Sequence, residues 1–446
     1  MTGIALTRWN KERVLLYALL FIGLIGAALA FKLSYFSNTN VLIGLALFPF
    51  SFFISGSRRN NFVYTGLLVF FLIIAATYGI RICYYFALAF YFFWVLELFV
   101  GRLNVLVVFL VVFMSPFFIQ VITILGFPLR LILSSYAGTL LNVVGANVQV
   151  EGNMMIVDGA MFSVDEACMG LNMLAISMLM GAFVLAYRYR RSRTMLGLYP
   201  SGIFFGVVFA LNVITNLARI IVLVYFGIPP EDPMHEFVGI LCLVVYVLIP
   251  LHFLSKWFVR KYGKARSEGG SQNIFNRSSV CLMIAFPLVV LGVGSSLERL
   301  REASAVDHAD VQFDQGTPEQ LSDGITKIST KNLLIYVKTI PEFFTGEHTP
   351  LLCWKGSGYE FSGVTTATVA GVTIYIGTLI KDGSTLHTAW WYSNGQIQTV
   401  SQIDWRMRML KGESKFCLVN VTAKDEQTLL ESIRPMFTTN PLIIKN

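Results

Sequence analysis

The sequence predicts an all-α polytopic membrane domain of about nine transmembrane helices with a small outer β-meander, followed by a soluble α+β domain. Composition supports this fold class, because 55% of the 446 residues are hydrophobic and only 13% are charged, against about 25% in soluble domains. Charge divides the chain in two. Residues 1–297 hold 20 Lys/Arg and 10 Asp/Glu, whereas residues 298–446 hold 14 and 16. We therefore expect a basic membrane domain at 1–297 and a near-neutral soluble domain at 298–446.

The transmembrane prediction rests on apolar stretches that are long enough to cross a hydrocarbon core of about 30 Å, which takes about 20 helical residues. The second stretch is short and contains Pro49, so the number of spans is approximate. The first stretch ends in small residues and resembles a cleavable signal peptide, although its length favours an uncleaved anchor. The nine stretches cover residues 14–31, 40–56, 62–80, 82–100, 103–125, 168–187, 203–226, 238–258 and 279–297.

Basic residues in the loops between these stretches predict the orientation. Arg102, Arg188 to Arg193 and Lys256 to Arg266 lie on alternate loops, on the same side as the basic N-terminus. That side is expected to be cytoplasmic. The N-terminus would then face the cytoplasm of a bacterium, and residues 298–446 would lie in the periplasm beyond its inner membrane. The net charge of +8 is explained by these topology signals, so the lipid bilayer is the expected partner and nucleic acid is not.

The segment between the fifth and sixth stretches differs from a simple loop. Residues 129–144 mix leucines with Ser, Thr and Asn, which favours a half-buried or interfacial helix. Three short apolar runs follow, and Asp158-Gly159 between the last two is a hairpin signal. They predict the β-meander. In the soluble domain, alternating runs such as 333–338, 364–370, 372–379 and 414–422 predict strands, and residues 426–436 predict a helix.

Three residues that are far apart in the sequence share one predicted depth in the outer leaflet. Cys168 and His235 stand at the outer starts of the sixth and eighth stretches, and Arg219 lies seven residues before Phe226, or roughly 10 Å at the helical rise. Each has a structural explanation as well: an inert thiol, a solvated imidazole, and an arginine that extends to the headgroups. An arginine within a span, however, usually faces a protein interior or a watery cavity and marks function.

Together these side chains suffice for acyl transfer. A thiolate is the attacking species, and nearby cations and a helix N-terminus lower a cysteine pKa. His235 could accept the thiol proton and return it to the leaving amine, and Arg219 could stabilise the oxyanion. The sequence contains no HExxH, CxxC or Gly-rich phosphate loop, so we expect neither a metal nor a cofactor.

The motifs around these positions resemble those of the exosortase and archaeosortase family of membrane enzymes. They read Glu-Ala-Cys-Met-Gly-Leu, Asn-Leu-Ala-Arg and His-Glu-Phe-Val-Gly. The resemblance covers residues 116–255 and identifies Cys168, Arg219 and His235 with the family's catalytic Cys, Arg and His. Met169 departs from the pattern, since many members have Ser there. The polar neighbours in the same motifs are our candidates for substrate binding: Glu166, Asn216 and Glu236.

The resemblance implies a function and its partners. Family members are expected to cleave exported proteins at a C-terminal sorting signal and to transfer the product to an acceptor, here a lipid or a glycan, often alongside exopolysaccharide production. Residues 347–359, with Trp390-Trp391-Tyr392, are similar to the periplasmic domain associated with exosortases, found elsewhere as a fusion or as a separate protein. That domain is expected to handle substrate or acceptor. It holds a rival nucleophile, Cys353, which could instead pair with Cys417 in a disulfide.

Three classes of function therefore stay open. The first is a membrane cysteine transpeptidase or protease. The second is a transporter, which this number of spans permits, although no inverted half-repeats with broken helices are visible. The third is a scaffold for exopolysaccharide or envelope assembly. Only the enzyme requires the thiol, the imidazole and the guanidinium together.

Overall fold

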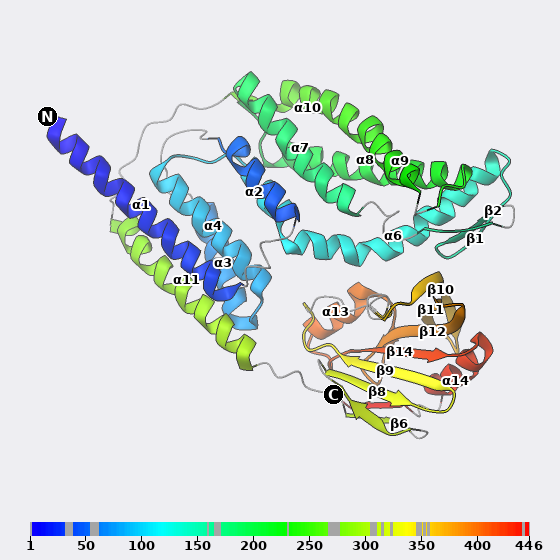
Figure 1. Ribbon diagram of the computed structural model, residues 1–446. Helices are drawn as coiled ribbons and strands as arrows, with labels where there is room; N and C mark the ends of the chain where they lie inside the picture. Colours follow the sequence, from blue (N-terminus) through cyan, green and yellow to red (C-terminus); the bar gives the residue numbers. More distant parts are fainter. Residues whose placement is uncertain are drawn as a thin grey trace. The chain divides into compact units, whose positions relative to one another are not determined.

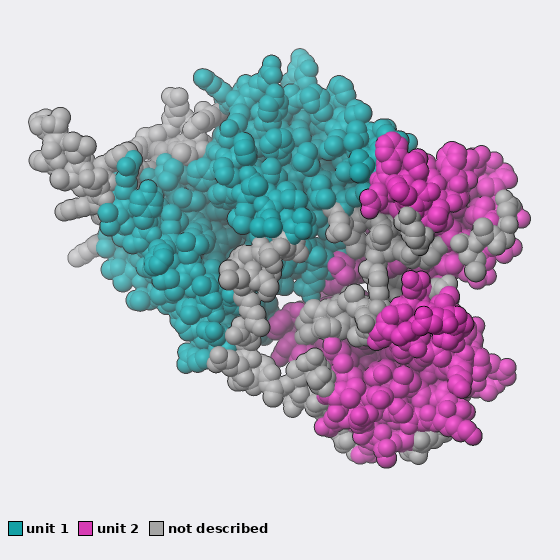
Figure 2. Space-filling model, viewed as in Figure 1, with its two compact units in different colours: residues 1–122, 170–215, 239–304 teal, residues 123–169, 216–238, 305–446 magenta. Residues whose placement is uncertain are grey.

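The computed structural model of the protein describes residues 2–31, 39–53, 62–157, 160–164, 171–229, 232–265, 277–303, 310–313, 316–321, 324–344, 350, 354, 357–438 and 442–445. The chain forms two compact units (Figures 1 and 2). Unit 1 comprises Met1–Ile122, Gly170–Thr215 and Gly239–Ser304, and unit 2 comprises Thr123–Met169, Asn216–Val238 and Ala305–Asn446.

Helices make up unit 1, and three of them, α6, α8 and α9, are shared with unit 2. Within the described residues, each of the nine expected apolar stretches overlaps with one helix or with two or three consecutive helical segments. The helices are α1 (Thr2–Ala30), α2 (Thr39–Ser51), α3 (Phe62–Tyr78), α4 (Arg81–Phe99), α5 (Leu106–Met114), α6 (Pro116–Val143), α7 (Leu171–Ser192), α8 (Leu198–Tyr225), α9 (Pro233–Leu243), a π-helical turn (Val244–Leu248), α10 (Ile249–Tyr262) and α11 (Arg277–Ala303). Strands β4 (Thr194–Met195) and β5 (Lys264–Ala265) pair at one edge.

Within the described part of the chain, five helical segments are long and apolar enough to cross a membrane. They are Glu12–Ala30, Arg81–Phe99, Leu198–Tyr225, Pro233–Tyr262 and Val280–Arg299. The pair Leu106–Met114 and Pro116–Gly126 forms a sixth if its bent halves are counted as one span, whereas Thr39–Ser51 and Phe62–Tyr78 are shorter apolar helices. The expected multi-span apolar character is therefore confirmed for five or six helices, and the number nine stays a prediction.

The bend between α5 and α6 lies where the sequence analysis did not expect it. We expected the span to end near residue 125 and a separate helix to follow, but the chain bends by 61° at Ser115 and α6 continues through Pro128. The residue before a proline avoids the helical region, and Ser115 is extended with ψ 146°. Its Oγ accepts a hydrogen bond from the N–H of Phe118 at 3.2 Å, which caps α6. Residues 129–143 are thus helical and half-buried as expected, but they continue α6 and do not form a separate helix.

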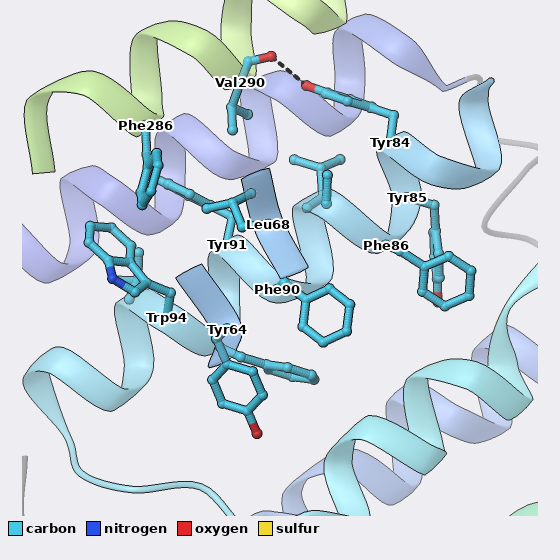
Figure 3. Close-up of a cluster of buried hydrophobic side chains, with 14 of the residues drawn as sticks. Tyr64, Leu68, Tyr84, Tyr85, Phe86, Phe90, Tyr91, Trp94, Phe286 and Val290 are labelled. Atoms are coloured by element: carbon cyan, nitrogen blue, oxygen red, sulfur yellow. Dashed lines mark hydrogen bonds between the residues drawn. The ribbon is translucent and has the colours of Figure 1, made fainter. Parts of the chain in front are cut away.

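An aromatic cluster forms one core of unit 1 (Figure 3). Trp94 of α4 is fully buried, and its ring centroid lies 5.0 Å from that of Phe286 in α11. The Tyr84 hydroxyl donates to the carbonyl of Val290 in α11 at 2.7 Å. The Tyr91 hydroxyl donates to the carbonyl of Leu19 in α1 at 2.9 Å. Helix α4 is thereby joined to two neighbouring helices by both packing and hydrogen bonds.

The predicted β-meander is confirmed. Strands β1 (Val148–Glu151), β2 (Met154–Val157) and β3 (Ala160–Ser163) form an antiparallel sheet in that order. The end of α6 holds it, because the Asn142 amide both donates to the carbonyl of Val148 at 2.9 Å and accepts from its N–H at 2.8 Å. A Cβ atom on Gly138 would stand 2.2 Å from Val150 Cγ2, so only glycine permits this close helix–strand contact.

The C-terminal part of unit 2 is built on an antiparallel sheet with helices, in agreement with the predicted α+β domain. The strand order is β10-β11-β12-β14-β9-β8-β7, and β13 pairs with β12. Helix α14 (Glu426–Thr438) packs against β12 and β14, and α13 (Gln402–Leu410) begins at a Ser401 cap. The strands are β6 (Asp310–Phe313), β7 (Pro318–Gln320), β8 (Ile325–Ser329), β9 (Leu333–Thr339), β10 (Glu360–Val369), β11 (Val372–Lys381), β12 (Ser384–Ser393), β13 (Gln398–Thr399), β14 (Cys417–Ala423) and β15 (Leu442–Lys445).

Candidate functional site

The sequence-predicted site residues fall on three segments of the chain. Cys168 and Glu166 lie outside the described residues, so their places in the site stay predictions, as does the helical start expected at Cys168. The described neighbours of that segment are Val164, which follows β3, and Leu171, where α7 begins. The other four residues are described: Asn216 and Arg219 on α8, and His235 and Glu236 on α9.

Arg219 occupies an apolar helix that ends in a defined turn. The side chain is only 4% exposed. It stands six residues before Tyr225, the end of α8, or roughly 9 Å along the axis. Gly227 terminates the helix with φ +62°: its N–H donates to the carbonyl of Val224, and the N–H of Ile228 donates to that of Leu223. This pair of bonds is a Schellman motif. Arg219 is thus a buried permanent cation close to a rigid helix end.

His235 stands at the beginning of the next helix. Pro233 is the first residue of α9, a position where its missing N–H costs nothing. Asp232 caps the helix, because its Oδ1 accepts from the N–H of Met234 and its carbonyl from the N–H of His235, both at 2.8 Å. His235 is therefore in the first turn, and its side chain is 3% exposed.

The two buried side chains lie on consecutive helices, on either side of the connection between them. Residues 226–232 join α8 to α9, and Arg219 and His235 stand within about two helical turns of that connection, or roughly 11 Å of helix. Both also belong to unit 2, together with the segment that leads to Cys168. The structure thus shows that Arg219 and His235, 16 residues apart in the sequence, are both buried, whereas their roles in a site stay predictions.

The two other described candidates differ in exposure. Asn216 is 8% exposed, and its Oδ1 accepts no hydrogen bond from any described residue. It lies three residues before Arg219, hence on the same face of α8. A buried amide oxygen needs a donor, so Asn216 is suited to accept one from a bound molecule. Glu236, by contrast, is exposed, and its substrate-binding role stays a prediction.

Arg130 is a further buried cation that was not among the residues predicted from the sequence. This residue of α6 is 5% exposed, and its Nη1 donates to the carbonyl of Val164 at 3.5 Å, a long and weak bond. The signal was present in the sequence, since Arg130 interrupts an apolar run and such charges mark functional interiors. Because Val164 precedes Cys168 by four residues, a second guanidinium is in contact with the chain that leads to the predicted nucleophile.

The C-terminal sheet holds a separate cavity of about 200 Å³. Its lining includes Tyr336, Lys338 and Trp354, and the Trp354 Nε1–H donates to Oδ1 of Asn420 at 3.0 Å. Trp354 directly follows Cys353, which lies outside the described residues, so a disulfide between Cys353 and the buried Cys417 stays a prediction. An aromatic cavity with polar groups at its wall is typical of a small ligand or peptide site.

The similarity to known proteins lies in the membrane domain. Residues 53–252 match the family model of the transmembrane exosortases, Exosortase_EpsH. No curated protein and no solved structure matches the chain. The matched range contains Cys168, Arg219 and His235, as well as Arg130 and the β-meander. Residues 53–252 are thus similar to the transmembrane exosortases, which supports the resemblance seen in the sequence, and together with the apolar helices this supports a multi-pass membrane protein.

Proposed function

We propose that the protein is a membrane cysteine transpeptidase or protease that cleaves the C-terminal sorting signals of exported proteins. Cys168 is the nucleophile, His235 transfers protons and Arg219 stabilises the oxyanion. One observation carries the proposal: within the part of the chain that matches the family model, a buried guanidinium and a buried imidazole lie on consecutive helices, on either side of the connection between α8 and α9. Burying either side chain in an apolar helix pair is costly, and acyl transfer gives both a role.

The reaction proceeds in two steps. His235 accepts the thiol proton while Cys168 Sγ attacks the scissile carbonyl carbon, and the negative charge on the carbonyl oxygen is stabilised by Arg219. The C–N bond then breaks, and the leaving amine takes the proton from His235. The product is a thioester between Cys168 and the exported protein. A nucleophile from an acceptor, a lipid or a glycan in transfer or water in hydrolysis, gives its proton to His235 and releases the thiol.

The substrate's expected form follows from the similarity to the exosortases and from the location of the site. The C-terminal sorting signal consists of a short motif, a transmembrane helix and a basic cluster. It would enter the site from the bilayer, so that the motif lies at the depth of the outer leaflet. The Lys/Arg distribution supports a periplasmic site in the bacterial inner membrane. Asn216 accepts a hydrogen bond from the substrate backbone, and Glu166 and Glu236 complete the binding site. The cavity beside Trp354 binds part of the substrate or the acceptor.

The test is the processing of a co-expressed membrane protein that carries a tripartite C-terminal sorting signal. Wild type is compared with Cys168→Ala and with Cys353→Ala at equal membrane abundance. We expect Cys168→Ala to abolish processing and Cys353→Ala to retain it. Processing that survives Cys168→Ala would reject the assignment, and the transporter and scaffold functions would then have to be tested by substrate flux and by assembly of the envelope polymer.

A further inference from the structure

The C-terminal sheet and the β-meander meet at one well-defined point within unit 2. The turn between β1 and β2 consists of Gly152 and Asn153, and it contacts Val364 of β10. The N–H of Asn153 donates to the carbonyl of Val364 at 3.3 Å. In return, the N–H of Val364 donates to Oδ1 of Asn153 at 2.7 Å. The two segments, about 210 residues apart in the sequence, are thereby hydrogen-bonded in both directions.

Asn153 is also bonded to the end of the meander. Its carbonyl accepts from the N–H of Val164 at 2.8 Å, and its Nδ2 donates to the carbonyl of Val164 at 3.4 Å. The side chain is 3% exposed, so these groups have lost their water. A buried residue whose two amide ends serve two different segments fixes their relative position, since the loss of either partner leaves a buried polar group unsatisfied.

Both sides of the contact are shaped to permit it. Gly152 has φ +63°, the left-handed region that favours glycine at the first central position of a two-residue hairpin turn. A Cβ atom there would stand 2.2 Å from the carbonyl oxygen of Val364. Strand β10 carries a bulge between Ser362 and Thr365, and Gly363 within it has φ +65°. The bulge turns the backbone of Val364 out of the regular ladder, where it can bond the meander.

We infer that the C-terminal domain docks onto the β-meander through Gly152, Asn153 and Val364, and that Asn153 is a positioning residue for the nucleophile. Val164, which Asn153 holds, precedes Cys168 by four residues, and Arg130 contacts the same carbonyl from α6. The C-terminal domain is then a structural part of the membrane site. The positioning role rests on the proposed function of Cys168, whereas the docking does not.

Gly152→Ala tests the docking, and Gly371→Ala is its matched control. Both glycines stand in two-residue hairpin turns with positive φ, but a Cβ atom on Gly371 meets nothing within 4 Å. The two variants therefore share the backbone strain and differ in the clash with Val364. We expect Gly152→Ala to lower the processing rate at saturating substrate by up to about 100-fold, since small displacements of reacting groups have effects of that size. We expect Gly371→Ala to process at nearly the wild-type rate.

Asn153→Asp separates positioning from docking. A carboxylate can still accept from the N–H of Val364 but cannot donate to the carbonyl of Val164. Two measurements are made on the full-length Asn153→Asp variant in membranes. The first is the hydrogen exchange of the peptide that contains Val364. The second is the pH profile of Cys168 alkylation by a membrane-impermeant maleimide, quantified by mass spectrometry. We expect unchanged exchange at Val364, a changed alkylation profile and slower processing. In Gly152→Ala we expect faster exchange at Val364 as well.

The outcomes separate this inference from the proposed function. If Cys168→Ala abolishes processing but Gly152→Ala and Asn153→Asp process and alkylate as wild type does, the inference is overturned and the function stands. If Cys168→Ala still processes, the function fails, and the docking is judged by exchange at Val364 alone. Faster exchange in Gly152→Ala but not in Gly371→Ala then supports the docking, and equal exchange overturns it.

Discussion

The aromatic core of unit 1 and the α8–α9 connection of unit 2 both bury polar side chains in apolar helices, but they do so differently. In unit 1 the phenols of Tyr84 and Tyr91 donate to backbone carbonyls of neighbouring helices. Glu97 likewise accepts from the backbone N–H of Leu103 at 2.8 Å. Beside the α8–α9 connection of unit 2 the buried groups include the guanidinium of Arg219 and the imidazole of His235.

The comparison shows that buried polarity alone does not identify a site. A buried neutral hydroxyl that donates a hydrogen bond to the carbonyl of a neighbouring helix joins the two helices, and its burial needs no further explanation. A guanidinium never loses its charge, so its burial costs more than packing alone would justify. The permanent charge of the Arg219 guanidinium, which neither Glu97 nor the tyrosines of the aromatic core carry, therefore distinguishes the candidate site from that core.

The largest expected effect is at Arg219. Arg219→Ala should lower the processing rate by about 100- to 1000-fold, as the loss of an oxyanion donor does, and Arg219→Lys should restore only part of it because a lysine lacks the planar fork. The measurement is the initial processing rate per amount of folded enzyme. Arg190→Ala is the control, because Arg190 is exposed and donates to the carbonyl of Pro49. An equal loss in both variants would contradict a special role for Arg219.

Trp94→Ala should show the opposite pattern. The fully buried ring leaves a cavity against Phe286, so the free energy of unfolding should fall by about 3–5 kcal/mol. The processing rate of the molecules that stay folded should be unchanged. Thermal unfolding in detergent and processing at low temperature measure the two quantities. A change in rate without a loss of stability would show that the aromatic core takes part in function.

Tyr84→Phe sharpens the comparison further. The substitution keeps the ring and removes only the hydroxyl that donates to Val290. The carbonyl of Val290 loses that bond, so we expect the free energy of unfolding to fall by about 1 kcal/mol with no effect on processing. Tyr78→Phe is the matched control, since that residue is exposed at the end of α3. An equal fall in the free energy of unfolding in both variants would show that the hydrogen bond between Tyr84 and Val290 does not stabilise the fold.

The smallest expected effect is a pH dependence in the C-terminal domain, far along the chain from the candidate residues. The Asp425 carboxylate accepts from the N–H and the hydroxyl of Thr428, both at 2.8 Å, and these bonds lower the pKa of Asp425. A depressed folded-state pKa stabilises the fold above the unfolded value, and this contribution is lost as pH falls through the folded one. Thermal unfolding should therefore be less sensitive to acid in Asp425→Asn than in wild type. An identical acid profile would contradict this role.

Local sequence patterns predicted much of the secondary structure because they depend on neighbouring residues. Alternation predicted β9, β10, β11 and β14, and the apolar runs around Asp158-Gly159 predicted the meander. The same reasoning misplaced one helix boundary. It placed a helix break between residues 125 and 129, whereas the chain bends at Ser115-Pro116. Ser115 caps α6 and Pro116 is its first residue, while Pro128 is accommodated within the helix.

The sequence by itself determined the membrane character of the protein, the type of its C-terminal domain and the identity of Cys168, Arg219 and His235 as candidates, since composition, period and motif are all local. Only the tertiary structure decided that Arg219 and His235 are both buried beside the α8–α9 connection, that Arg130 reaches the carbonyl of Val164, and that Asn153 joins the meander to β10. Hydrogen bonds between segments 34 and 211 residues apart leave no periodic trace in the sequence, because the partner of each buried group is set by the packing of distant elements.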